Sequence, residues 1–213
     1  MNLPDSIKTI TSLSEFKLKE KGSQFLAFSK QIKDETEAVK YLSDLKKNFY
    51  DASHHCYSYK IMDGTYKYSD DGEPNGTAGI RIYNAQNHFE LTNLITVVVR
   101  FFGGTKLGVG PLGKAYYDAS YQSLDLANKV TLTLYQEIEI IFDYSFSKTI
   151  HHFTGKFKAQ IKESTFNNKP GIIILIQPQF LKNLIDELGI ATNNKCEIIA
   201  SDRFEFLDYS QKS

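Results

Sequence analysis

The chain of 213 residues has no tryptophan and only two cysteines. These cysteines, Cys56 and Cys196, lie far apart in the sequence and form no Cys-x-x-Cys pair. Such usage argues against a disulfide framework and against a cysteine-ligated zinc site. We therefore expect each cysteine to be a buried free thiol.

An excess charge of one sign and a long apolar run are also missing. The 25 basic and 25 acidic side chains cancel, so no global field draws the chain onto nucleic acid or an anionic membrane, and such binding requires a local patch. No apolar run approaches the roughly 20 residues of a membrane span. The first residues also lack the pattern of a signal peptide. We expect a cytoplasmic protein with no membrane partner.

Hydrophobic residues make up 41% of the chain, enough for a core, and their periodicity predicts two domains, residues 1–134 and 135–213. The first domain is expected to contain two strands around a break at 21–23 and an amphipathic helix after Asp34. Further expected elements are a strand at 56–61, a buried strand at 95–102, a helix at 112–126 with Pro111 in its first turn, and a closing strand at 130–134.

The second domain shows the order β-α-β-β-α-β, which is typical of a ferredoxin-like unit. Its expected elements are strands at 136–142, 156–165, 172–176 and 196–200, and helices at 144–152 and 178–188, the last stopped by Gly189. The predicted fold class is therefore α+β with two domains.

An acidic loop, residues 69–79, carries Asp70, Asp71 and Glu73 among glycines and a proline. Three carboxylates on a tight turn could bind Mg²⁺ or orient a water molecule. The same residue types also suit an exposed structural turn, so both interpretations stay open. His54 and His55 begin the strand before this loop and could join a ligand or metal site. Neighbouring strand residues point to opposite faces, so at most one can do so readily.

A basic loop, residues 97–110, has the layout of a phosphate cradle, with a buried strand, glycines, a lysine and then a helix N-terminus. Neither Gly-x-x-x-x-Gly-Lys-Ser/Thr nor Gly-x-Gly-x-x-Gly is present. Phe101 and Phe102 could stack on bases, but they flank so apolar a strand that we assign them to the core. The candidate residues for binding phosphate or nucleic acid are Arg100, Gly103, Gly104, Lys106, Gly108 and Lys114.

Three runs, residues 53–59, 70–79 and 98–108, resemble the signature of the IMPACT family, also called the YigZ family. The resemblance covers about residues 10–134, and the remainder is similar to the second domain of bacterial members. It implies a first domain similar to the second domain of a small-subunit ribosomal protein and to domain IV of elongation factor G. The second domain would be similar to domain V of that factor.

The resemblance has limits. Eukaryotic relatives restrain a starvation-response kinase largely through an N-terminal RWD domain, for which this chain has no room, so that role is not expected here. The family usually shows Gly-Gly-Leu-x-Arg-Ala-Tyr where residues 110–116 read Gly-Pro-Leu-Gly-Lys-Ala-Tyr. Lys114 keeps the positive charge but lacks the planar fork of arginine.

These observations lead to one principal hypothesis: RNA or ribosome binding in translation or its regulation, with Arg100, Lys106 and Lys114 contacting phosphate. The alternatives are a metal-dependent hydrolase or phosphoryl-transfer enzyme that uses the acidic loop, and a regulator that binds only protein. In a further alternative the loops are structural, with Asp71 or Glu73 pairing with Arg100 or Lys106. No cofactor is expected, and an enzyme is not favoured.

Overall fold

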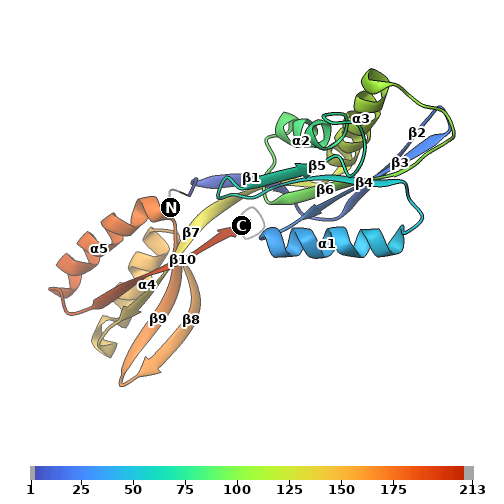
Figure 1. Ribbon diagram of the computed structural model, residues 1–213. Coiled ribbons are helices and arrows are strands. Elements are labelled where there is room, and N and C mark those ends of the chain that lie inside the picture. Colours follow the sequence, from blue (N-terminus) through green and yellow to red (C-terminus); the bar gives the residue numbers. More distant parts are fainter. Residues whose placement is uncertain (1–2, 209–213) are drawn as a thin grey trace. The chain divides into compact units, whose positions relative to one another are not determined.

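The computed structural model describes residues 3–208 and has the expected α+β fold (Figure 1). The chain divides into two compact units, of which the first comprises residues 7–131 and the second comprises residues 3–6 and the chain from 132 onward. Strand β7 (Lys129–Ile141) runs through the division. The two strands expected at 130–134 and 136–142 are therefore one continuous strand, which is a correction to the predicted pattern.

The first unit is built on an antiparallel sheet with the strand order β2-β3-β6-β4-β5. Its strands are β2 (Ser14–Glu20), β3 (Ser23–Gln31), β4 (His54–Lys60), β5 (Tyr66–Ser69) and β6 (Leu94–Phe101), and a short strand β1 (Ser6–Ile10) precedes them. The nearly all-apolar β6 lies at the centre, where both of its faces are covered.

Helix α1 (Glu35–Asn48) covers one face of this sheet, whereas α2 (Gly79–His88) and α3 (Val109–Leu126) cover the other (Figure 1). Of the two possible caps in the sequence, Thr36 and Asp34, it is Asp34 that caps α1, because its Oδ1 accepts a hydrogen bond from the N–H of Glu37 at 2.9 Å. Strands β1 and β5 and helix α2 were not predicted from the sequence. One apolar core lies beneath α2 and α3, and a second lies beneath α1.

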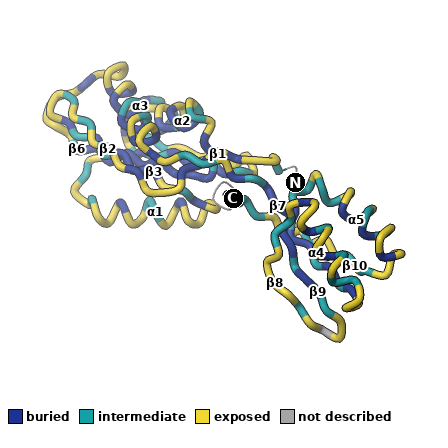
Figure 2. The backbone as a smooth tube through the Cα atoms, turned by 180° about the vertical axis from the view of Figure 1, so that it is seen from behind, coloured by how far each residue is buried: buried dark blue, intermediate teal, exposed yellow. Residues whose placement is uncertain are grey.

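The second unit places β9 (Lys169–Ile176) between β7 and β8 (Gln160–Asn167), while β10 (Glu197–Leu207) pairs with the other side of β7. Helices α4 (Ser147–Lys156), which follows a short 3₁₀ turn (Tyr144–Phe146), and α5 (Pro178–Thr192) complete the expected order. Gly189 does not stop α5, which continues to Thr192 and is followed by its C-cap residue Asn193 in a left-handed conformation. Figure 2 shows β8 mostly exposed, as suits an edge strand.

Both cysteines are free thiols, with Cys56 buried and Cys196 half-buried, and burial raises the pKa of the Cys56 thiol well above its usual range. Within residues 3–208, no helix combines the length and the apolar composition needed to cross a bilayer.

Candidate functional site

Asp70 holds the acidic loop in shape. Its Oδ1 accepts hydrogen bonds from the backbone N–H groups of Ala78 and Gly79 at 2.9 and 2.8 Å, and its Oδ2 accepts one from Gly76 at 2.9 Å. Helix α2 has no side-chain cap from its own N-cap residue, so Asp70 supplies that cap from earlier in the chain. Both carboxylate oxygens of Asp70 are therefore engaged by the backbone.

Asp71 ties the same loop to β4 and α1. Its Oδ2 accepts the N–H of His55 at 2.6 Å, and its Oδ1 accepts from Lys46 Nζ at 3.1 Å. Burial opposes the charged carboxylate, but the hydrogen bonds from His55 and Lys46 hold the pKa of Asp71 below its usual range. The backbone carbonyl of Asp71 lies 2.9 Å from His54 Nδ1 and accepts its hydrogen bond.

Glu73 joins the acidic loop to the basic loop. Its Oε1 accepts a hydrogen bond from Arg100 Nη1 at 2.5 Å and one from the Tyr116 hydroxyl at 2.7 Å. The Glu73 and Arg100 side chains are only 4% and 5% exposed. Of the pairings considered between the two loops, this one is formed. Within residues 3–208, no group of three or more His, Cys, Asp and Glu side chains is arranged to hold a metal ion.

Arg100 retains hydrogen-bonding capacity after pairing with Glu73. His54 on β4 lies directly opposite Arg100 on β6, so both side chains project from the same face of the sheet. A second guanidinium nitrogen, Nη2, donates to Ser23 Oγ at 3.3 Å, while Nε is buried with no acceptor among the described residues. The planar group also lies 5.5 Å from the ring centre of Phe102.

A pocket of about 450 Å³, here called the α3 pocket, opens where the two loops meet α3. Its lining residues are His54, Glu73, Pro74, Arg100, Phe102, Lys106, Leu107, Gly108, Val109 and Leu112. Phe102 is 49% exposed, so its assignment to the core is wrong, whereas Phe101 packs against the apolar cluster beneath α1. Lys106 is exposed and forms no ion pair with any residue from 3 to 208.

The N-terminus of α3 borders this pocket. Gly108, at φ 82°, is its N-cap residue and offers no side-chain hydrogen bond, and the first turn carries no acidic residue. The amide groups of a first helical turn have no partner within the helix. Together with the helix dipole, they favour an anion at this end.

Lys114 lies at another pocket. It pairs with Asp118 one turn along α3, and with Arg81 and Gly110 it lines a pocket of about 460 Å³, here called the Arg81 pocket. The structure thus groups Arg100 with Lys106 and places Lys114 beside Arg81. Arg81 was not among the residues predicted for the site, because helix α2, which carries it, was not predicted from the sequence.

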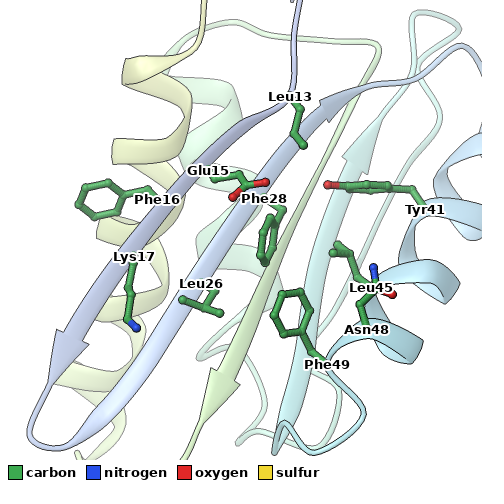
Figure 3. A pocket seen from close by; sticks show the side chains of 10 residues that line it. All are labelled: Leu13, Glu15, Phe16, Lys17, Leu26, Phe28, Tyr41, Leu45, Asn48 and Phe49. Carbon is green, nitrogen blue, oxygen red and sulfur yellow. The ribbon is translucent and has the colours of Figure 1, made fainter.

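A further pocket, of about 600 Å³, lies on the opposite face of the sheet, between α1 and strands β2 and β3 (Figure 3). Tyr41 and Phe49 point from the α1 side toward Phe28 on β3, and the only charged lining residues are Glu15 and Lys17. Burial, with a contribution from Glu15, raises the pKa of Tyr41 to about 12. This pocket shows no concentration of positive charge.

We expect His55 to make the protein less stable in mild acid. Burial lowers its pKa despite the opposing charge of Asp71, and its Nε2 is buried without a partner among the described residues. Below the unfolded-state pKa of about 6.5, the unfolded chain binds a proton that the folded chain does not. The free energy of unfolding should therefore fall as the pH drops below about 6.5, by up to roughly 1.4 kcal/mol per pH unit.

Urea denaturation of the wild type and of the His55→Gln variant between pH 7.5 and 5.5 measures this contribution. The variant should lose part of the decline, whereas the control His54→Gln, which keeps His55, should retain it. Equal declines in the wild type and His55→Gln would contradict the assignment.

Comparison with known proteins places these features in a wider group. The family model of the Impact N-terminal domain matches residues 21–124. The chain is 30% identical over 160 residues to the IMPACT family member YvyE of Bacillus subtilis, covering 74% of this chain and 70% of that protein. It is 29% identical over 175 residues to an IMPACT family member of Haemophilus influenzae, covering 79% and 84% of the two chains.

Two further comparisons agree with this similarity. The IMPACT family member YigZ of Escherichia coli is 32% identical over 130 residues, which cover 57% of this chain and 59% of that protein. A crystal structure described as that of a hypothetical protein superposes with a TM-score of 0.69 at 22% identity, covering 94% of this chain and 100% of the other. At that identity the superposition speaks for the fold alone.

Proposed function

Because the chain belongs to the IMPACT family, we propose that it is a cytoplasmic RNA-binding protein that acts on the ribosome in translation or its regulation. The observation that carries this proposal is the N-terminus of α3, which has no side-chain cap and no acidic residue in its first turn, beside Lys106, which is exposed and has no ion-pair partner among the described residues. An anion is the natural ligand of such a helix end.

Positive side chains lie on both sides of the first turn of α3. Lys106 lines the α3 pocket together with Val109, while Arg81 and Lys114 line the Arg81 pocket together with Gly110. Several cations spaced around one helix end suit a ligand with repeated phosphates better than a single small anion. A local patch of this kind also explains how a chain with no net charge can bind a polyanion.

The carboxylates of the acidic loop serve other purposes, so the hydrolase alternative receives no support from their arrangement. Asp70 caps α2, Asp71 binds the backbone of β4 and Lys46, and Glu73 neutralises Arg100. A carboxylate whose oxygens already accept hydrogen bonds from the protein is a weak candidate for a shared metal site.

The test is a triple variant in which Lys106, Lys114 and Arg81 become alanine. These side chains are not buried, so the fold should survive, whereas substitution of the buried Arg100 would confound binding with stability. We expect the wild type to co-sediment with ribosomes and to bind single-stranded RNA in a fluorescence-anisotropy titration. The triple variant should bind at least tenfold more weakly, and its salt dependence should be shallower by about 0.7 per lost phosphate contact.

A matched control replaces three exposed lysines at and near α1, Lys33, Lys40 and Lys47, with alanine. This variant has the same net charge as the triple variant but keeps the cations around α3, so its RNA binding should stay close to that of the wild type. Equal weakening by the two triple variants, or no binding of RNA or ribosomes by the wild type, would refute the proposal.

A further inference from the structure

The α3 pocket has two chemically different parts. Its walls are mainly apolar and include Pro74, Leu107 and Leu112, with Phe102 and Val109 as much as 49% and 65% exposed. Its polar groups are the Glu73–Arg100 pair, His54 and Lys106. An apolar cavity with a few placed polar groups is typical of a site for one small planar or aliphatic group, not for a bare ion.

The position of Glu73 determines where a phosphate can lie. The Glu73 carboxylate is held in the pocket by Arg100 and Tyr116, so a phosphate beside it would meet a like charge in a partly desolvated site. The first turn of α3 carries no acidic residue, and Lys106 forms no ion pair with any residue from 3 to 208. The phosphate therefore belongs near Lys106 and Val109, and an uncharged group belongs beside Glu73.

The groups around Glu73 can form hydrogen bonds with a neutral partner. The Nε of Arg100 has no acceptor among the described residues. The backbone carbonyl of Asp71 can only accept a hydrogen bond, so the Nδ1–H of His54 donates to it. The other ring nitrogen of His54, Nε2, lies on the side of Glu73, 3.8 Å from its Oε1. These groups include a donor and acceptors, the combination that the edge of a nucleobase can meet.

Phe102 provides the surface for the flat face of such a base. Its ring is held on one side by the guanidinium of Arg100, 5.5 Å from the ring centre, and remains half-exposed. A ring fixed in this way stacks on a base with little loss of side-chain entropy, and base stacking on an aromatic side chain contributes about 1–3 kcal/mol.

We propose that the α3 pocket binds one unstacked nucleotide of single-stranded RNA, with its base on Phe102 and its polar edge toward Glu73, Arg100 and His54, and with its phosphate at Lys106 and the N-terminus of α3. The inference rests on the proposed RNA binding and adds that the protein selects single strands. Duplex RNA keeps its bases stacked and paired and so cannot fill the pocket.

Three oligomers of equal length and matched backbone test this assignment by fluorescence anisotropy: a single-stranded RNA, the same strand in a duplex, and an abasic ribose-phosphate strand. The variant is Phe102→Ser, and the control is Tyr50→Ser, which removes an aromatic side chain that is 85% exposed and lies outside the pocket. We expect Phe102→Ser to weaken binding of the single strand about tenfold. The wild type should bind the abasic strand more weakly by a similar factor, and Phe102→Ser should leave that weaker binding unchanged.

A second measurement uses small ligands and does not depend on RNA length. Adenosine 5′-monophosphate should shift the imidazole NMR signals of His54 in the wild type, and inorganic phosphate at the same concentration should not. Equal binding of the three oligomers with no effect of Phe102→Ser would overturn the nucleotide pocket while leaving backbone binding of RNA intact. Failure of all three oligomers to bind would instead overturn the proposed function itself.

Discussion

Replacing Arg100 with methionine should lower the free energy of unfolding by about 3–5 kcal/mol. Methionine fills much of the same volume, but it leaves the Glu73 carboxylate, 4% exposed, without its counter-charge. Among the described residues, the Tyr116 hydroxyl alone would still donate to Glu73 Oε1 at short distance. The variant also removes the donor to Ser23 and the guanidinium above Phe102. Urea denaturation monitored by circular dichroism measures the loss.

The companion variants separate the lost pairing from lost packing. Glu73→Leu alone should also destabilise the protein, because it leaves the buried Arg100 without its counter-charge. The double variant Arg100→Met/Glu73→Leu should be destabilised by less than the sum of the two single effects. A coupling free energy of about 1–3 kcal/mol is expected for neighbours of this kind. Additive effects would show that the two loops are held together by something other than this pair.

The parts of the fold that the sequence predicted are those with local causes. Helix α1 shows a regular apolar stripe and carries its own cap in Asp34. Strand β6 is apolar enough to indicate burial on both faces, and Pro111 does lie in the first turn of α3. In each case, the residues that determine the element belong to it or adjoin it.

The parts that it missed depend on contacts between distant residues. Helix α2 is not capped by its own N-cap residue but by Asp70, which lies on the other side of the loop before the helix. Gly79 lies so close to the backbone of Ser69 that a side chain at this position would clash. Strand β7 was predicted as two strands divided near Tyr135, but residues on both sides of that point pair with β10. Periodicity alone cannot reveal such long-range constraints.

The same contrast between local and long-range causes applies to the candidate site. The residue types of the two loops pointed to carboxylates and cations near one another, and the Glu73–Arg100 pair was among the pairings considered. The sequence could not decide among those pairings, nor could it place Lys114 away from Lys106, because both depend on how α3 packs. Because Phe102 follows an apolar strand, the sequence predicted a core position for its ring, which is in fact exposed.

Gly103→Ala should be among the most destabilising small substitutions in the chain. A Cβ at this position would lie 1.9 Å from the carbonyl carbon of Gly22 and 2.2 Å from the nitrogen of Ser23, so backbone atoms would have to separate. The turn between β2 and β3 packs directly on the end of β6 at this point. Overpacking typically costs about 1–3 kcal/mol, and a clash with backbone should reach the upper end of that range or exceed it. Thermal and urea denaturation measure the loss.

Gly110→Ala is the matched control, since it adds the same methyl group close by in the sequence. A Cβ on Gly110 meets nothing within 4 Å, and Gly110 lies in the first turn of α3. Alanine there should leave stability unchanged or raise it by up to about 1 kcal/mol through helix propensity. If Gly103→Ala lowered the stability no more than Gly110→Ala, the backbone of the turn between β2 and β3 would have to move aside at little energetic cost. The basic loop would then not be held in place by close backbone packing, and the Phe102 side chain that follows β6 would lose its rigid support.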